Sequence, residues 1–157
     1  MIDMGILTSI KKFFCDFLKC NSLSYPVFNV IGKYDINEVL TLLKSEFPNA
    51  SILLSDLEYE KISKEDLIKF LRSDDTDLYQ YKPEIFDCDD FSYRLMGQLS
   101  IPGYSGIPFG IVWTKTPRGG HALNCFIDEN CNVWLVEPQS DKVFKLPKDW
   151  DVYIVMM

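Results

Sequence analysis

The sequence of 157 residues contains one histidine, His121, and no pair of cysteines at the two-residue spacing of structural zinc sites. Its five cysteines are an odd number, so they indicate neither a complete disulfide framework nor a zinc cluster. No apolar run approaches the roughly 20 residues that span a bilayer, so no transmembrane segment is expected. No signal peptide is recognised either, and a cytoplasmic location is therefore expected.

Positive charge is also scarce, because 16 Lys and Arg face 23 Asp and Glu and the net charge is −7. Nucleic acid is therefore not an expected partner, since phosphate binding needs clustered basic side chains. The acidic surface is by itself no more than ordinary solubility requires. With 47% hydrophobic residues, the chain has the length and composition of one globular domain with its own core.

The first 34 residues are predicted to form an amphipathic helix and a connector, followed by the main domain at residues 35–157. Apolar side chains recur at helical spacing in this segment, with most of the lysines elsewhere on the wheel: Ile6, Leu7, Ile10, Phe13, Phe14, Phe17 and Leu18. Such a helix packs on its own domain or at a subunit interface, for example in a homodimer. A membrane-surface or partner-binding helix is the alternative.

The main domain is predicted to be α+β, with N-terminal helices followed by an antiparallel sheet. Helices are predicted to begin after the capping residues Asp35, Ser63 and Asp87, and the last of them runs from about Cys88 to Leu99. After Pro102 the apolar period changes to two, which predicts strands at residues 109–114, 121–127, 131–137, 142–146 and 152–156. Residues 51–54 are a short strand or a buried turn, and the acidic run at residues 74–77 is read as a solvated turn because it lacks the spacing of an EF-hand.

Cys88 lies among three carboxylates, those of Asp87, Asp89 and Asp90, at the start of a predicted helix. The helix N-terminus favours a thiolate, whereas the neighbouring acids raise the pKa of the thiol. The sequence therefore requires a basic partner, a metal ion or both beside Cys88. The other cysteines, Cys15, Cys20, Cys125 and Cys131, are interpreted as small buried hydrophobic residues.

His121 supplies the basic partner if the strands around residues 128–130 form a hairpin with that three-residue loop. In this register His121 lies directly opposite Glu137, and one face of the hairpin is almost wholly apolar. Cys88, His121 and Glu137 then form a nucleophile, a general base and the group that orients it. The backbone N–H of Cys88, or Gln80, is the candidate donor to an oxyanion.

Three motifs, Asp-Cys-Asp-Asp-Phe, Gly-His-Ala-Leu-Asn and Val-Glu-Pro-Gln-Ser, resemble the papain-like cysteine protease domain of Marasmius oreades agglutinin and its relatives, including bacterial and phage proteins. The resemblance covers about residues 50–157. It implies a papain-like catalytic domain at residues 35–157, with Cys88, His121 and Glu137 as catalytic triad. It further implies dependence on Ca²⁺, with Mn²⁺ as a substitute, held by Asp89, Asp90 and Gln139. Oxygen donors suit Ca²⁺, which would offset the acids around Cys88. The alternative is that the two aspartates only cap a helix. The sugar-binding domain of the agglutinin has no counterpart in this sequence.

Two classes of function follow. The first is a calcium-dependent cysteine peptidase or amidase, a hydrolase acting on a protein or peptide substrate through an acyl-enzyme. The same triad would also serve a transglutaminase or a deamidase. The second is a non-catalytic binding or inhibitor protein that occludes a partner with its acidic surface or N-terminal helix.

Overall fold

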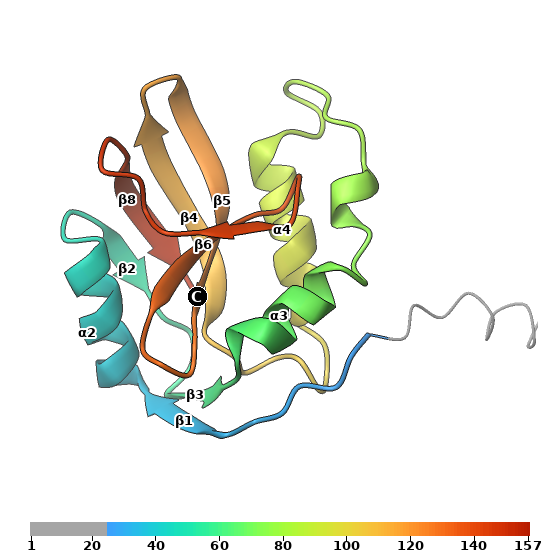
Figure 1. Ribbon diagram of the computed structural model, residues 1–157. Coiled ribbons are helices and arrows are strands. Elements are labelled where there is room, and N and C mark those ends of the chain that lie inside the picture. The colour runs from blue at the N-terminus through green and yellow to red at the C-terminus, as the bar shows by residue number, and fades with distance from the viewer. Residues whose placement is uncertain (1–24) are drawn as a thin grey trace, which may run out of the picture.

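The computed structural model describes residues 25–157 (Figure 1). The predicted amphipathic helix at residues 6–18, together with Cys15 and Cys20, lies outside the described residues. The elements in chain order are β1 (Gly32–Asp35), α2 (Ile36–Glu46), β2 (Ser51–Leu53), β3 (Glu58–Lys61), α3 (Lys64–Leu71), η1 (Thr76–Leu78), α4 (Cys88–Leu99), β4 (Phe109–Thr116), β5 (Gly119–Ile127), β6 (Val133–Glu137), β7 (Lys142–Phe144) and β8 (Asp151–Met156).

Six strands form one sheet in the order β2-β8-β4-β5-β6-β7, and β1 pairs with β3 in a separate two-stranded sheet. Strand β2 runs parallel to β8, whereas the other pairs in the large sheet are antiparallel. The helices cover the large sheet from its two faces, with α2 on one side and α3 and α4 on the other (Figure 1).

Alternation along β5 divides the apolar residues between two cores, because successive side chains of a strand point to opposite faces. Leu123, Cys125 and Ile127 pack in the cluster that includes Val39 and Leu43 of α2. Phe126 packs on the opposite face, in the cluster with α3 and α4. The sheet is therefore buried on both sides, and the functional groups lie near the strand ends.

Side-chain caps begin the helices where the sequence predicts. The carboxylate of Asp35 accepts from the N–H of Asn37 and Glu38, and Glu38 returns a bond to the N–H of Asp35. Ser63 accepts from the N–H of Asp66 at 3.1 Å. Because these caps satisfy backbone donors that a helix leaves free, the predicted starts of α2 and α3 are confirmed.

The prediction of helices followed by an antiparallel sheet is wrong in its order and in its pairing. Three strands, β1, β2 and β3, come before α3, and the pairing of β2 with β8 is parallel. The β1–β3 pair is short and polar, with Tyr34 and Tyr59 as its buried residues, so it carries too little alternation to be recognised. None of the helices within residues 25–157 is long and apolar enough to cross a membrane.

The predicted three-residue loop of the β5–β6 hairpin is also wrong, because Ile127 pairs with Val133 and five residues connect the strands. The buried carboxylate of Asp128 holds this longer loop by accepting from the backbone N–H of Asn130 and Asn132. It also accepts from the indole Nε1 of Trp134 at 2.7 Å. Cys131 lies in the loop at a φ of 63° and is exposed, so its predicted burial is wrong, whereas Cys125 is buried as predicted.

Candidate functional site

Helix α4 places Cys88 at its first residue, and polar contacts hold this helix against the sheet. The hydroxyl of Ser92 donates to the carbonyl of Cys88 at 2.7 Å. The buried amide of Asn124 in β5 donates to the carbonyl of Ser92 and to that of Gly110 in β4, each at 3.1 Å. Asn124 therefore joins α4 to two strands one turn away from the thiol.

The sulfur of Cys88 is half-buried and lies beside β5. Burial raises the pKa of this thiol, the N–H of Ala122 donates toward the sulfur and lowers the pKa, and the carboxylates of Asp87 and Asp89 raise it again. The net direction is upward, so the protonated thiol is favoured at neutral pH. The environment thus disfavours the form of cysteine that acts as a nucleophile.

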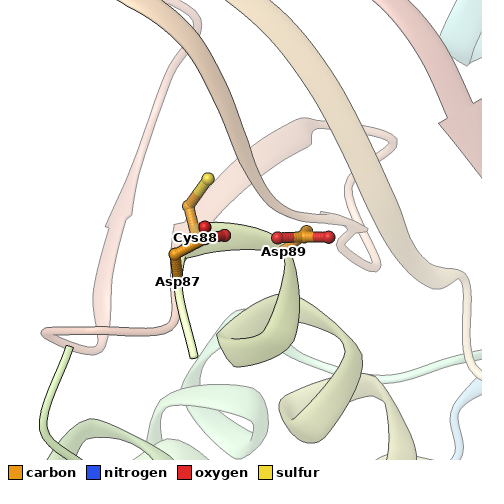
Figure 2. A group of neighbouring side chains, drawn as sticks. All are labelled: Asp87, Cys88 and Asp89. Atoms are coloured by element: carbon orange, nitrogen blue, oxygen red, sulfur yellow. The ribbon is translucent and has the colours of Figure 1, made fainter. Parts of the chain in front are cut away.

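Asp87, Cys88 and Asp89 form a cluster at the first turn of α4, with the sulfur pointing away from the body of the helix (Figure 2). One potential ligand atom from each of the three lies within 4.8 Å of the others. The Asp89 carboxyl donates a hydrogen bond to Asp87, which raises the pKa of Asp89 and lowers that of Asp87. The ionisation of one carboxyl group therefore depends on the other, and a cation between them would offset their charges.

The other predicted ligands, Asp90 and Gln139, lie in the first turn of α4 and just after β6 and make different contacts. Oδ2 of Asp90 accepts from the N–H of Asp87 at 3.1 Å, as the capping prediction requires. The N–H of Gln139 lies 3.4 Å from Oε1 of Glu137, just after β6. Gln80 lies in the exposed segment between η1 and the turn that precedes α4.

His121 and Glu137 form a pair, with Nε2 of the imidazole 2.8 Å from Oε2 of the carboxylate. About four-fifths of each side chain is buried, since 21% and 19% are exposed. The register differs from the predicted one by two residues, which keeps both side chains on the same face of the hairpin. They meet as diagonal neighbours, a separation that long side chains can bridge. The N–H that donates toward the Cys88 sulfur belongs to Ala122, the residue that follows His121 in β5.

A cavity of about 350 Å³ opens at this end of the hairpin, and the His121–Glu137 pair and the indole of Trp150 line it. The rings of His121 and Trp150 lie edge to face with centroids 6.0 Å apart, and Phe144 contacts Trp150 in the same way at 5.9 Å. The remaining lining residues are Thr116, Arg118 and Gly120. A second cavity of about 470 Å³ shares Thr116, Arg118 and Trp150 with the first and adds Pro117 and Asp149. Together the two cavities form a groove lined by the aromatic ring of Trp150, the guanidinium of Arg118 and the carboxylates of Glu137 and Asp149.

The sequence reasoning missed Trp150 and Arg118, which come from the β7–β8 connection and the β4–β5 turn. Neither belongs to a motif: Arg118 lies three residues before His121 on the β4–β5 turn, and the pairing of β4 with β5 and β8 brings Trp150 to the histidine. It also missed Asp74, which was read as part of a solvated turn. Asp74 is buried and accepts from the N–H of Thr76 and the hydroxyl of Tyr25, so the interpretation as a wholly solvated turn is wrong.

Comparison with known proteins shows the family of the chain. The profile of the family described as Agglutinin C-terminal matches residues 59–143, a stretch that contains α4 and the whole β5–β6 hairpin. The chain belongs to this Agglutinin C-terminal family. A search of curated proteins finds no match.

Two similar solved structures share the fold. One is described as a complex of PSL1a with E64. It matches with a TM-score of 0.70 and 21% identity, and the match covers 80% of this chain and 51% of the PSL1a chain. The other is Polyporus squamosus lectin bound to the human-type influenza-binding epitope Neu5Acα2-6Galβ1-4GlcNAc, with a TM-score of 0.68, 21% identity and coverages of 80% and 49%. The chain thus spans about half the length of these proteins.

These findings correct the predicted papain-like fold, the predicted cysteine peptidase or amidase and the assignment to thiol proteases. The family is that of agglutinin C-terminal domains, and the fold is shared with a lectin. The three motifs identify the family but do not report the state of the thiol. Burial and two flanking carboxylates hold the pKa of Cys88 above its ordinary value, so the motif alone does not give this thiol the reactivity of a nucleophile. A protein or peptide substrate is likewise not supported.

Proposed function

We propose that this chain is a non-catalytic binding domain and that its ligand is a carbohydrate, held in the groove beside Trp150. The observation that carries the proposal is the cavity in which an aromatic ring faces the His121–Glu137 pair. Ligand sites are concave, largely apolar and furnished with a few fixed polar groups, and this groove has all three properties.

The chemistry of the lining suits a sugar ring. The face of an indole accommodates the apolar C–H face of a sugar, while the carboxylate of Glu137 accepts hydrogen bonds from hydroxyls. Arg118 adds a guanidinium, whose planar fork binds carboxylates through two parallel hydrogen bonds. An acidic sugar such as Neu5Ac, which the lectin structure contains, would place its ring on the indole and its carboxylate at the guanidinium of Arg118.

Calcium belongs to the proposal because Asp87 and Asp89 present hard oxygen donors that lie within 4.8 Å of each other. Carboxylate oxygens suit Ca²⁺, and Mn²⁺ as a substitute, whereas the sulfur of Cys88 is a soft donor that Ca²⁺ does not favour. The ion would supply positive charge at the first turn of α4. The carboxylates of Asp87 and Asp89 would hold it, next to the strand that carries His121.

The test is titration calorimetry of the full chain with Neu5Acα2-6Galβ1-4GlcNAc, in calcium and in chelator. We expect Trp150→Ala to weaken binding by more than about tenfold, since buried Trp residues dominate binding energies. Tyr153→Ala, an exposed aromatic on β8 outside the groove, is the matched control. Arg118→Lys should weaken binding of the sialylated trisaccharide more than binding of the asialo disaccharide Galβ1-4GlcNAc, because the substitution loses the bidentate contact.

Two results would overturn the proposal. The first is absence of binding to sialylated and neutral glycans alike, which would leave glycan recognition to the half of the lectin that this chain does not span. The second is cleavage of an amide bond in casein or a peptide library that disappears in Cys88→Ala, because a non-catalytic domain cannot depend on its thiol for turnover.

A further inference from the structure

A separate cavity of about 230 Å³ lies at the C-terminal end of α4, where the loop that follows this helix meets β3 and the residue after β8. It has no lining residue in common with the groove beside Trp150 or with the cluster around Cys88. Helix α4 has 12 residues, which places about 18 Å between the cavity and the first-turn cluster. The proposed carbohydrate site therefore does not account for this cavity.

The inner wall of the cavity is apolar and buried. Leu99 at the end of α4, Ile107 and Phe109 are each 6% exposed or less. Met96 and Met157 add two thioethers to this wall, and thioether sulfur makes favourable contacts with the edges of aromatic rings. The wall therefore suits an aromatic ring.

The size of the cavity limits the ligand to a small molecule. An apolar cavity of about 150 Å³ holds one benzene molecule. At about 230 Å³, this cavity has room for a ring with a short side chain, and it is smaller than the pockets of about 300 Å³ or more that take larger ligands.

The polar groups of the cavity include a carboxylate on its exposed rim, that of Asp56. The hydroxyl of Ser55 donates to Oδ2 of Asp56 at 3.2 Å, and the N–H of Asp56 donates to the hydroxyl of Tyr59 at 3.3 Å. Tyr59 is 2% exposed and also lines the cavity. These two hydrogen bonds fix the loop that carries the carboxylate beside the buried tyrosine.

The charge around the cavity is negative. Its lining, drawn from residues 25–157, contains no Lys, Arg or His. Glu60 lies beside the lining residue Gly106, since a Cβ on that glycine would be 3.9 Å from Cδ of Glu60. Within the described part of the chain neither Asp56 nor Glu60 forms an ion pair. The C-terminal end of α4 adds the negative pole of the helix dipole. A cation at the rim is therefore the complementary charge.

We propose that this cavity binds a small arylalkylamine, with its ring on the apolar wall and its ammonium group at Asp56. The hydroxyls of Ser100 and Ser105, which also line the cavity, offer further acceptors for an ammonium group. The proposal is independent of the carbohydrate ligand, because the two sites share no residue.

The test is an NMR titration of the backbone amides of the full chain with phenethylamine, and with phenethyl alcohol as a neutral probe of the same shape. We expect saturable shifts at residues 99–107, with a dissociation constant of about 1 mM for the amine. Asp56→Asn should weaken binding of the amine by about threefold to fivefold and leave the alcohol unchanged, since an ion pair at an exposed rim has a modest effect. Asp151→Asn, at an exposed aspartate on β8, is the matched control and should change neither.

A second substitution tests the cavity itself. Ser105→Trp places an indole at the exposed rim, so it should block the opening without disturbing the buried wall. It should weaken both probes by about tenfold or more. Ser51→Trp, at an exposed serine on β2, adds the same ring elsewhere and should weaken neither.

Three outcomes would overturn the proposal. Shifts centred on His121 and Trp150 would place the amine in the groove beside Trp150. Equal affinity for the amine and the alcohol would show that Asp56 does not bind the ammonium group. Absence of saturable shifts at about 10 mM, tenfold above the expected dissociation constant, would show that the cavity does not take this class of ligand. A failure of glycan binding, by contrast, would leave the amine shifts unchanged.

Discussion

The hydroxyl of Tyr34 donates to the carbonyl of Asp128 at 2.6 Å, although 94 residues separate them in the sequence. The same oxygen accepts from the N–H of Cys131 at 3.2 Å, so the first described strand is tied to the β5–β6 loop. Burial raises the pKa of this hydroxyl, which stays protonated as the bond requires. A single side chain thus joins the two-stranded sheet to the hairpin that carries His121.

Tyr34→Phe should destabilise the fold by about 1–3 kcal/mol, because it leaves a largely buried carbonyl and N–H without their partner. The free energy of unfolding in urea measures this loss. Tyr153→Phe, which alters an exposed tyrosine, is the control and should leave the urea midpoint within error. Equal effects of the two substitutions would show that the Tyr34 bond contributes nothing specific.

Gly110 is predicted to tolerate no side chain. A Cβ at this position would meet the carbonyl oxygen of Met156 and lie 2.9 Å from Cβ of Met157, so Gly110→Ala should cost about 1–3 kcal/mol or more. Gly97→Ala is the matched control, because Gly97 is helical and has open space around it. That change should stabilise α4 by about 0.5–1 kcal/mol. A neutral Gly110→Ala in thermal unfolding would contradict the close approach of β4 to β8.

Asp141 should make stability depend on pH. Burial, together with the charges of Asp77 and Asp74, raises its pKa to about 7. Because the folded value exceeds the unfolded one of about 3.9, the contribution of the protonated form is complete below about pH 4 and is lost as the pH rises through 7. Asp141→Asn should therefore be neutral at pH 4 and stabilising at pH 8. The gain is on the order of 1–2 kcal/mol, because the carboxyl is partly exposed.

Asparagine is a fair replacement at this position, since Asp141 has a φ of 56° and Asn tolerates the left-handed region. Urea unfolding at the two pH values gives the difference. Asp149→Asn, at an exposed aspartate, serves as control. A stabilisation by Asp141→Asn that is the same at pH 4 and pH 8 would exclude the carboxyl as its source.

Calcium should raise the melting temperature, because an ion that binds only the folded chain stabilises it by about 2.7 kcal/mol at a hundredfold excess over its dissociation constant. Differential scanning calorimetry with calcium, manganese and chelator measures the shift. Asp89→Asn should abolish it, whereas Asp56→Asn, at an exposed aspartate elsewhere, should not. Cys88→Ser should retain it, since the ion is held by oxygen. A calcium shift that survives Asp89→Asn would place the ion elsewhere.

The sequence was sufficient for those parts of the fold that local chemistry determines. Asp35, Ser63 and Asp87 mark the starts of three helices, and the predicted span of α4 from Cys88 to Leu99 is the observed one. These signals are local because a cap acts within one turn. The pairing of β1 with β3 and of β2 with β8 depends on residues far apart in the chain, and neither left a periodic signal.

The site shows the same division. The prediction that His121 faces Glu137 used the wrong loop length. The strand register differs by two residues, which leaves both side chains on the same face of the hairpin, and they are in contact. The effect of Asp87 and Asp89 on the pKa of Cys88 follows from the sequence, whereas the burial that raises this pKa most depends on tertiary structure. Trp150 could not be predicted at all, since only tertiary structure brings it to the histidine.

The parallel pairing of Ser51–Leu53 with Ile154–Met156 sets an order on biosynthesis. A chain emerging from the ribosome completes α2 and β2 about a hundred residues before the strand that receives β2 exists. Contacts of such long sequence separation form slowly and late. During translation the part of α2 that packs against β6 stays uncovered until β6 has been made, so a chaperone that shields newly made segments would find an apolar surface there.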